Sequence, residues 1–180
     1  MSDRSISIVP KISTYPDRET KANKILVWLI SLNVVKPDIS DCVLGRSHGY
    51  AMSSGAKDIV NEPEFLPVRL ITNGLEVITE RRVFHTGENG LDKFICPNCK
   101  QDISKEDWDF FNEWFERKSD TITCPLCNVA SEIHSFSSSP EWGFSDLGFT
   151  FWNWPELKKP FLKDFQHKLG IDINVVYTWL

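Results

Sequence analysis

The chain has 180 residues, of which 41% are hydrophobic and 25% are charged, and its formal net charge is −5 at pH 7. This composition is that of an ordinary globular protein, so it excludes a disordered chain, and the length allows one domain or one domain with a small appended module. An acidic chain lacks the overall positive charge of nucleic-acid-binding proteins, so such a role would require a local basic patch.

The first part of the chain predicts a strand-like or irregular lead-in over residues 1–16, followed by a helix. Four apolar residues then lie at helical spacing: Ile25, Trp28, Leu29 and Leu32. This spacing favours a helix, although a buried strand over residues 25–35 stays open. We expect neither a secretory signal nor a membrane helix, because no apolar run approaches the roughly 18 residues that a membrane span needs. We therefore expect a cytoplasmic protein whose five cysteines are reduced.

Residues 36–67 are rich in glycine, proline, serine and aspartate, and they predict a loop with one short helix near residues 55–61. This loop contains Ser47 beside His48, which leaves a hydrolytic enzyme open as an alternative. A serine and a histidine adjacent in sequence do not make a catalytic triad, however, because the members of a triad meet only in space. Cys42 has no partner pattern, and we interpret it as a small buried residue.

An Asn-Gly pair predicts a β-hairpin in the region 68–84. Residues 68–72 and 75–79 are rich in β-branched and apolar side chains, and Asn73-Gly74 lies between them. Such a pair is the strongest short-range hairpin signal, because both residues of the tight turn need a positive φ.

Two matched Cys-Pro-x-Cys pairs predict a metal site. Cys96 and Cys99 form the first pair, Cys124 and Cys127 form the second, and 24 residues separate the two pairs. Two residues between cysteines allow both sulfurs to bind one ion, and two such knuckles complete a tetrahedron of four sulfurs. A shell of four thiolates has no open position for water or substrate, so we expect one structural zinc ion rather than a catalytic one.

The residues around the cysteines agree with this interpretation. Asn128 follows the second pair and tolerates the left-handed conformation that the exit of a knuckle often needs, whereas Lys100 is a less natural occupant of the same position. The motif resembles the zinc-ribbon and rubredoxin-like knuckle class, and the resemblance covers about 40 residues.

An acidic helix is predicted between the two knuckles, from Ser104 to about Lys118. Its aromatic residues share one wide arc, and four acidic residues form a stripe on the opposite side: Glu106, Asp109, Glu113 and Glu116. Residues 101–120 hold seven acidic and three basic side chains, which gives a local charge of −4. The stripe is either a solvated face or a docking surface for a basic partner, and both alternatives disfavour nucleic acid.

An aromatic segment follows the cysteines. Alternation over residues 149–154 places aromatic side chains on both faces of a strand, which predicts a central strand that is covered on both sides. The alternative is an exposed stacking platform. The sequence Gly-Phe-Thr-Phe-Trp-Asn-Trp-Pro at residues 148–155, placed after four cysteines, resembles uncharacterised bacterial proteins of similar size. That resemblance covers residues 75–180 and implies a bacterial origin, and it brings no catalytic motif.

The predicted fold class is α+β, with a mixed sheet, packed helices and an inserted zinc-ribbon module. We expect an N-terminal α/β portion over residues 1–90, the zinc ribbon over residues 91–136, and a strand–helix–strand unit over residues 137–180 that completes the main domain. In the last unit, residues 156–169 form the helix, and Gly170 ends it.

The function that these patterns favour is a non-catalytic cytoplasmic binding protein, which uses its acidic stripe to engage another protein of basic character. One concrete version is an immunity-type inhibitor that masks a basic bacterial toxin, because opposite charges speed association. Two alternatives stay open: a hydrolytic enzyme that uses the Ser47/His48 loop, and a regulator whose ribbon contacts nucleic acid.

Overall fold

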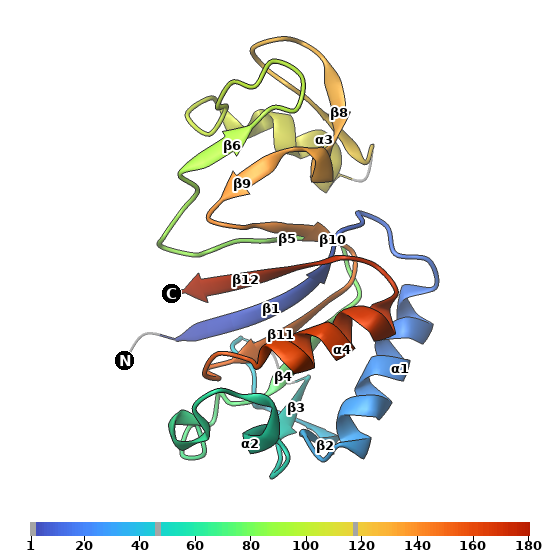
Figure 1. The fold of residues 1–180 in the computed structure, drawn as a ribbon, viewed down its shortest axis with the longest axis vertical. Helices are drawn as coiled ribbons and strands as arrows, with labels where there is room; N and C mark the ends of the chain where they lie inside the picture. Colours follow the sequence, from blue (N-terminus) through green and yellow to red (C-terminus); the bar gives the residue numbers. More distant parts are fainter. Residues whose placement is uncertain (1–2, 46–47, 117–118) are drawn as a thin grey trace.

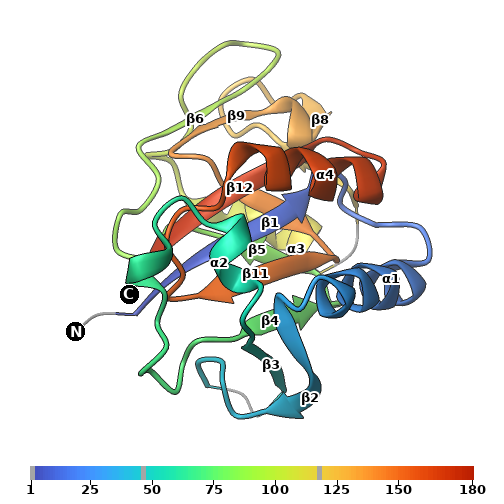
Figure 2. The same ribbon diagram turned by 60° about the horizontal axis from the view of Figure 1, so that its bottom comes forward.

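The computed structural model describes residues 3–45, 48–116 and 119–180. The fold is α+β, as the sequence predicts, with helices packed on one face of a six-stranded antiparallel sheet. Figures 1 and 2 show helices α1 and α4 on the same side of this sheet, and Figure 1 shows residues 93–136 beyond the opposite side. We call this second part, residues 93–136, the cysteine arm.

The elements of the main body have the following bounds: β1 Arg4–Pro10, α1 Arg18–Ser31, β2 Val35–Ser40, β3 Gly49–Met52, α2 Ala56–Ile59, η1 Pro63–Phe65, β4 Leu75–Ile78, β5 Arg82–Phe84, β10 Gly143–Ser145, β11 Gly148–Trp152, α4 Lys159–Leu169 and β12 Ile173–Trp179. The cysteine arm, and the strand that follows it, contain these elements: β6 Lys93–Ile95, η2 Trp108–Phe111, α3 Asn112–Phe115, β7 Thr121–Thr123, β8 Ala130–Glu132, η3 Ile133–Ser135 and β9 Ser137–Ser139.

The large sheet has the strand order β12-β1-β11-β4-β3-β2, so it joins strands from both ends of the chain. The sequence predicted a mixed sheet, which has both parallel and antiparallel pairs of strands. Each pairing between neighbouring strands of the described sheet is instead antiparallel. The strand-like lead-in becomes β1, which lies between β11 and β12 and is buried along almost its whole length.

The helices cover one face of the sheet because their apolar residues recur at helical spacing. Ile25 and Leu29 of α1 and Phe165 of α4 share one hydrophobic core with Phe149 of the sheet. The helix α4 ends where the sequence predicted, because Gly170 takes a left-handed conformation with φ 73° and its amide donates to the Gln166 carbonyl. Among the described residues, no helix combines the length and the apolar character that crossing a membrane requires.

The strand β11 lies in the middle of the sheet, and all five of its residues are buried. Phe149 and Phe151 point into the core beneath the helices, whereas Trp152 packs on the other face with Cys42. The indole of Trp152 donates a 3.1 Å hydrogen bond to the buried carboxylate of Glu76. The predicted central strand with two covered faces is therefore confirmed.

The prediction of a β-hairpin in the region 68–84 is wrong. Residues 68–72 form no strand, and β4 pairs with β11 and β3 instead. The amides of Asn73 and Gly74 both donate to the Cys42 carbonyl, so these two residues do not close a tight turn. Gly74 is needed for close packing, because a Cβ atom there would lie 2.2 Å from the Cys42 sulfur. Nor do β4 and β5 pair with each other, because β5 pairs with β10.

The predicted acidic helix is shorter than expected. It consists of the 3-10 turn η2 and the single turn α3, so it spans residues 108–115. The backbone of Asp107 is extended, with ψ 132°, and the Ser104 carbonyl accepts a 3.1 Å hydrogen bond from the Trp108 indole. Residues 104–107 therefore lie outside the helix, and Lys118 lies outside the described residues.

Because Trp152 is only 8% exposed whereas Trp108 is 42% exposed, we expect the two indoles to respond differently to a quencher. The fluorescence that Trp152→Phe removes should be blue-shifted and poorly quenched by acrylamide. The fluorescence that the matched control Trp108→Phe removes should be red-shifted and readily quenched. Equal quenching of the two difference spectra would contradict the buried position of Trp152 and would favour an exposed aromatic platform.

Candidate metal centre

The four cysteines lie on two loops of the same shape. The first loop follows β6, and in it the Cys96 amide donates to the Gln101 carbonyl while the Lys100 amide donates to the Cys96 carbonyl. The second loop joins β7 to β8, and the amides of Cys124 and Asn128 make the equivalent bonds, to the carbonyls of Val129 and Cys124 respectively. Each Cys-Pro-x-Cys segment is therefore closed by the same pair of backbone hydrogen bonds.

The residue after each second cysteine has a left-handed backbone. Asn128 has φ 58°, as its residue type predicts, and Lys100 has φ 62°. Lysine has no special preference for this conformation, so the geometry of the knuckle imposes it at Lys100.

The four sulfur atoms converge on one point. The Sγ atoms of Cys96 and Cys127 lie 3.9 Å apart, those of Cys99 and Cys124 also lie 3.9 Å apart, and all four lie within 4.8 Å of one another. Four sulfurs at about 2.3 Å from a zinc ion would lie about 3.8 Å apart in a regular tetrahedron. A disulfide needs sulfurs at about 2.05 Å, so the cysteines are free thiols, and together they could hold a metal ion.

The surroundings of Cys127 and Cys124 give these two thiols different pKa values. The Asn98 side-chain amide donates to Cys127 Sγ at 3.5 Å and, with a backbone bond, lowers the pKa of this thiol to about 6. Burial raises the pKa of Cys124 to about 11. Cys127 is therefore ready to bind a cation as a thiolate at neutral pH, and Cys124 would exchange its proton for the metal.

The cysteine arm has a hydrophobic core of its own, which continues into the main body. Phe94, Ile103, Trp114 and Ile122 are each no more than 1% exposed. The indole of Trp114 also donates a 2.8 Å hydrogen bond to the hydroxyl of Ser13 in the main body. The four-cysteine site therefore lies next to a packed core rather than at the end of a bare loop.

Two further contacts join the cysteine arm to the main body through Arg81, which follows β4. Its guanidinium lies over the ring of Trp114, with 4.3 Å between Cζ and the ring centroid. It also forms a 2.7 Å ion pair with Asp120. The arm is thus attached by a charged group as well as by apolar packing.

The four residues of the predicted acidic stripe, Glu106, Asp109, Glu113 and Glu116, are all exposed. They do not share one regular helix, because Glu106 and Glu116 lie beyond the ends of the helical segment 108–115. The predicted aromatic arc is also divided. Trp114 and Phe111 are buried, whereas Trp108 and Phe115 are 42% and 57% exposed. The segment that carries the four acidic residues therefore also carries two exposed aromatic side chains.

The residues of the hydrolase alternative are not brought into a described catalytic arrangement. His48 is exposed, and Ser47 lies outside the described residues. Cys42 is 4% exposed and packs with Val43 and Trp152, which confirms the interpretation of a small buried residue. Burial also raises the pKa of the Cys42 thiol, so it has little thiolate character.

The structure brings together one pair that the sequence does not reveal, because its members are 121 residues apart. Nε2 of His134 lies 3.5 Å from the hydroxyl of Ser13, and burial lowers the pKa of His134 to about 4. Ser13 is only 1% exposed and accepts the Trp114 indole, so its hydroxyl is closed to a substrate. We therefore assign this pair a structural role between the cysteine arm and the main body.

Comparison with protein-family models, with curated proteins and with solved structures found no match to this chain.

We predict one bound zinc per chain in protein purified without added metal, because four thiolates at tetrahedral spacing favour zinc. Elemental analysis should give about one equivalent, and Cys99→Ser should lower this value sharply. The matched control is Cys42→Ser, which removes a buried thiol outside the cluster and should keep the zinc. Iron as the bound metal, or four titratable thiols without metal, would contradict the prediction.

The buried imidazole of His134 predicts a loss of stability in acid. Its pKa is about 4 in the folded chain and about 6.5 in an unfolded one, so the unfolded chain binds more protons between these values. The free energy of unfolding should fall as the pH falls through this window, by about 3 kcal/mol at most from this group. The positive charges of Lys11 and Arg81 lower the pKa of His134, as burial does, whereas the negative charge of Asp120 raises it.

Urea unfolding of the wild type and of His134→Gln between pH 7 and pH 4 measures this contribution. Carboxylates and any metal loss affect both proteins alike, so the difference between the two pH profiles reports on His134. The variant should show the shallower decline. Parallel profiles would mean that His134 is not a buried neutral group.

Proposed function

We propose that Cys96, Cys99, Cys124 and Cys127 hold one structural zinc ion, and that residues 91–136 form a zinc-ribbon module inserted between the two halves of the main domain. The sulfur distances and the two equivalent knuckles support this proposal. Bound zinc would supply folding free energy to an arm whose strands have only three residues each. Its coordination shell would be complete, so the metal would have no part in catalysis.

We propose that the chain is a non-catalytic binding protein and that this module displays an acidic docking surface for a basic protein partner. The observation that carries the proposal is the exposure of Glu106, Asp109, Glu113 and Glu116, in a segment that also contains the exposed rings of Trp108 and Phe115. Aromatic residues are typical anchors of protein interfaces, and charges of one sign steer a partner of opposite sign.

An immunity-type inhibitor that masks a basic bacterial toxin in the cytoplasm is the concrete form of this function that we propose. Such an inhibitor must associate quickly, and attraction between opposite charges raises the association rate at low salt. Nucleic acid is a poor candidate for the same surface, because phosphates are bound by lysine and arginine side chains.

Reversal of two charges tests the docking surface. The double variant Glu106→Lys, Glu113→Lys should lose the basic proteins that the wild-type chain captures from a bacterial extract. It should also associate more slowly with each captured protein when the two are purified. Both positions are exposed, so the free energy of unfolding should change by no more than about 0.5 kcal/mol. The difference in rate should shrink in 1 M salt, where the Debye length is only about 3 Å.

The matched control is the double variant Glu64→Lys, Asp164→Lys, which makes the same change in net charge on exposed positions of the main body. It should keep the partners and most of the association rate. A purified partner that binds both double variants as it binds the wild type, at low and at high salt, would remove the acidic surface from the function.

A further inference from the structure

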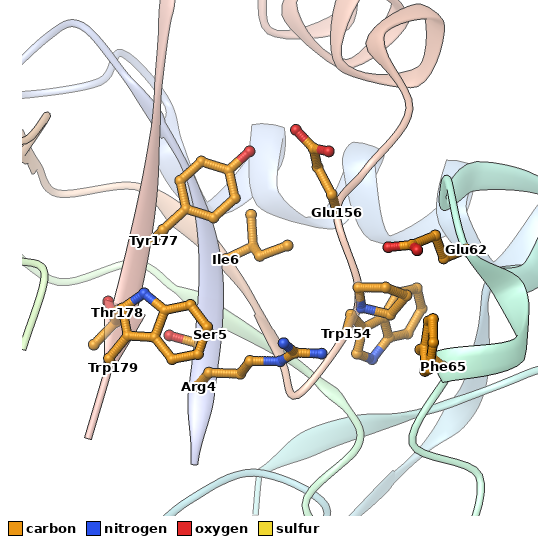
Figure 3. Close-up of a pocket in the computed structure, with 11 residues that line it drawn as sticks. Arg4, Ser5, Ile6, Glu62, Phe65, Trp154, Glu156, Tyr177, Thr178 and Trp179 are labelled. Atoms are coloured by element: carbon orange, nitrogen blue, oxygen red, sulfur yellow. The ribbon is translucent and has the colours of Figure 1, made fainter. Parts of the chain in front are cut away.

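A pocket of about 420 Å³ lies in the main body, at the end of the sheet where β1 begins and β12 ends. Four segments form it: the start of β1, the end of β12, the short helix η1, and the link between β11 and α4. Its volume falls within the range of about 300–1,000 Å³ that is typical of small-molecule sites. Figure 3 shows its side chains, which surround a common space.

The pairing of β1 with β12 explains one wall of the pocket. Arg4 lies opposite Trp179 in the antiparallel register, and Ile6 lies opposite Tyr177. Residues two apart on a strand point to the same face of the sheet, so these four side chains share the face on which Ile6 joins the helical core. Tyr177 and Trp179 are 40% and 44% exposed, so their rings are available to a ligand.

The opposite wall is aromatic as well. Phe65 of η1 is 59% exposed, and Trp154 lies beside it with only 1% of its surface exposed (Figure 3). The indole of Trp154 donates a 2.7 Å hydrogen bond to the Asn73 carbonyl, which holds the ring in place. Asn61 ties the two segments together, because its amide and its side chain donate to the Glu156 carbonyl and carboxylate respectively.

The charged groups of the pocket are segregated. The guanidinium of Arg4 extends between the aromatic walls, with 5.8 Å between its Cζ atom and the centroid of Trp179 (Figure 3). The carboxylates of Glu62 and Glu156 line other parts of the pocket, and Figure 3 shows them apart from each other, both above the Arg4 guanidinium in this view. The phenol of Tyr177 points toward Glu156. Burial raises the pKa of Tyr177, and the negative charge of Glu156 raises it further.

We propose that this pocket binds a small zwitterion, with an ammonium group toward Glu62 and Glu156, a carboxylate toward Arg4, and an apolar or aromatic body between the rings. The class includes amino acids and short peptides with an apolar side chain. The site is independent of the four cysteines and of the acidic docking surface, so it goes beyond the function proposed above.

The segregated charges favour a zwitterion over ligands with a single charge. A simple organic cation would meet the carboxylates and aromatic rings, which attract it, but also the guanidinium of Arg4, which repels it. A phosphate-bearing ligand would pair with Arg4 but would meet two carboxylates in the same small space. Only a ligand with both charges satisfies both sides of the pocket.

The probes are 4-(aminomethyl)benzoate, which carries both charges on an aromatic ring, and its singly charged relatives benzylamine and benzoate. Aliphatic ω-amino acids of increasing length, from 4-aminobutyrate to 6-aminohexanoate, measure the separation of the two charges. Titration of the full chain by nuclear magnetic resonance reports binding at the indole N–H groups of Trp154 and Trp179. The best zwitterion should bind about tenfold or more tightly than either singly charged relative, because each charge-assisted contact contributes roughly that factor.

Substitutions assign each charge. Arg4→Gln should weaken the zwitterion about tenfold and should strengthen benzylamine, because it removes the repulsion of the cation. Glu62→Gln should weaken the zwitterion and benzylamine while leaving benzoate unchanged or stronger. The matched control for Glu62→Gln is Glu64→Gln, one residue beyond Pro63 and outside the pocket lining, which should change nothing.

Three results would each overturn the proposal. The first is a benzylamine affinity equal to that of the best zwitterion and insensitive to Arg4→Gln. The second is binding of every probe that shifts neither Trp154 nor Trp179. The third is no binding of any zwitterion in the series to a chain that keeps its native spectrum.

Discussion

The convergence of four cysteine sulfurs within 4.8 Å of one another brings the two knuckles of the cysteine arm together. Its strands β6, β7 and β8 have three residues each and form two-stranded sheets only, and its helical segment has eight residues. Elements this short are marginal by themselves in water. The left-handed backbone at Lys100, where lysine has no preference for it, indicates that the knuckle imposes its geometry on the chain. A metal at the sulfurs would add the free energy that these elements lack.

The acidic surface and the pocket lie on different parts of the molecule. The acidic surface belongs to the cysteine arm, which contacts the main body through Trp114, Arg81 and His134. The pocket is formed where β1 and β12 pair, and its floor rests on the core beneath the helices. The buried strand β11 pairs with β1, and both of its faces are covered. A ligand in the pocket and a partner on the arm would therefore occupy different regions of the molecule (Figure 1).

Sequence patterns predicted correctly those features that depend on neighbouring residues in the chain. The matched Cys-Pro-x-Cys pairs indicated the sulfur cluster, the alternation of residues 149–154 indicated β11, and Gly170 marked the end of α4. Prediction was wrong where distant residues compete for a backbone group. Asn73-Gly74 has the composition of a hairpin turn, but its amides bond to Cys42, more than 30 residues away in the sequence. The acidic helix was predicted too long for a different reason, because the backbone of Asp107 is extended directly before η2. The pocket was missed because Arg4, Phe65, Glu156 and Trp179 come from four segments that only the fold brings together.

Hydrogen exchange of the full chain, with and without a strong zinc chelator, tests most directly whether a metal at the four cysteines supports the arm. We expect chelation to remove protection from the amides of residues 93–136, including those of Cys96, Cys124 and Asn128. The amides of β1, β11 and β12 should keep theirs, because the main core is packed independently of the sulfurs. Unchanged protection of the arm after the chelator has removed all metal would contradict the account.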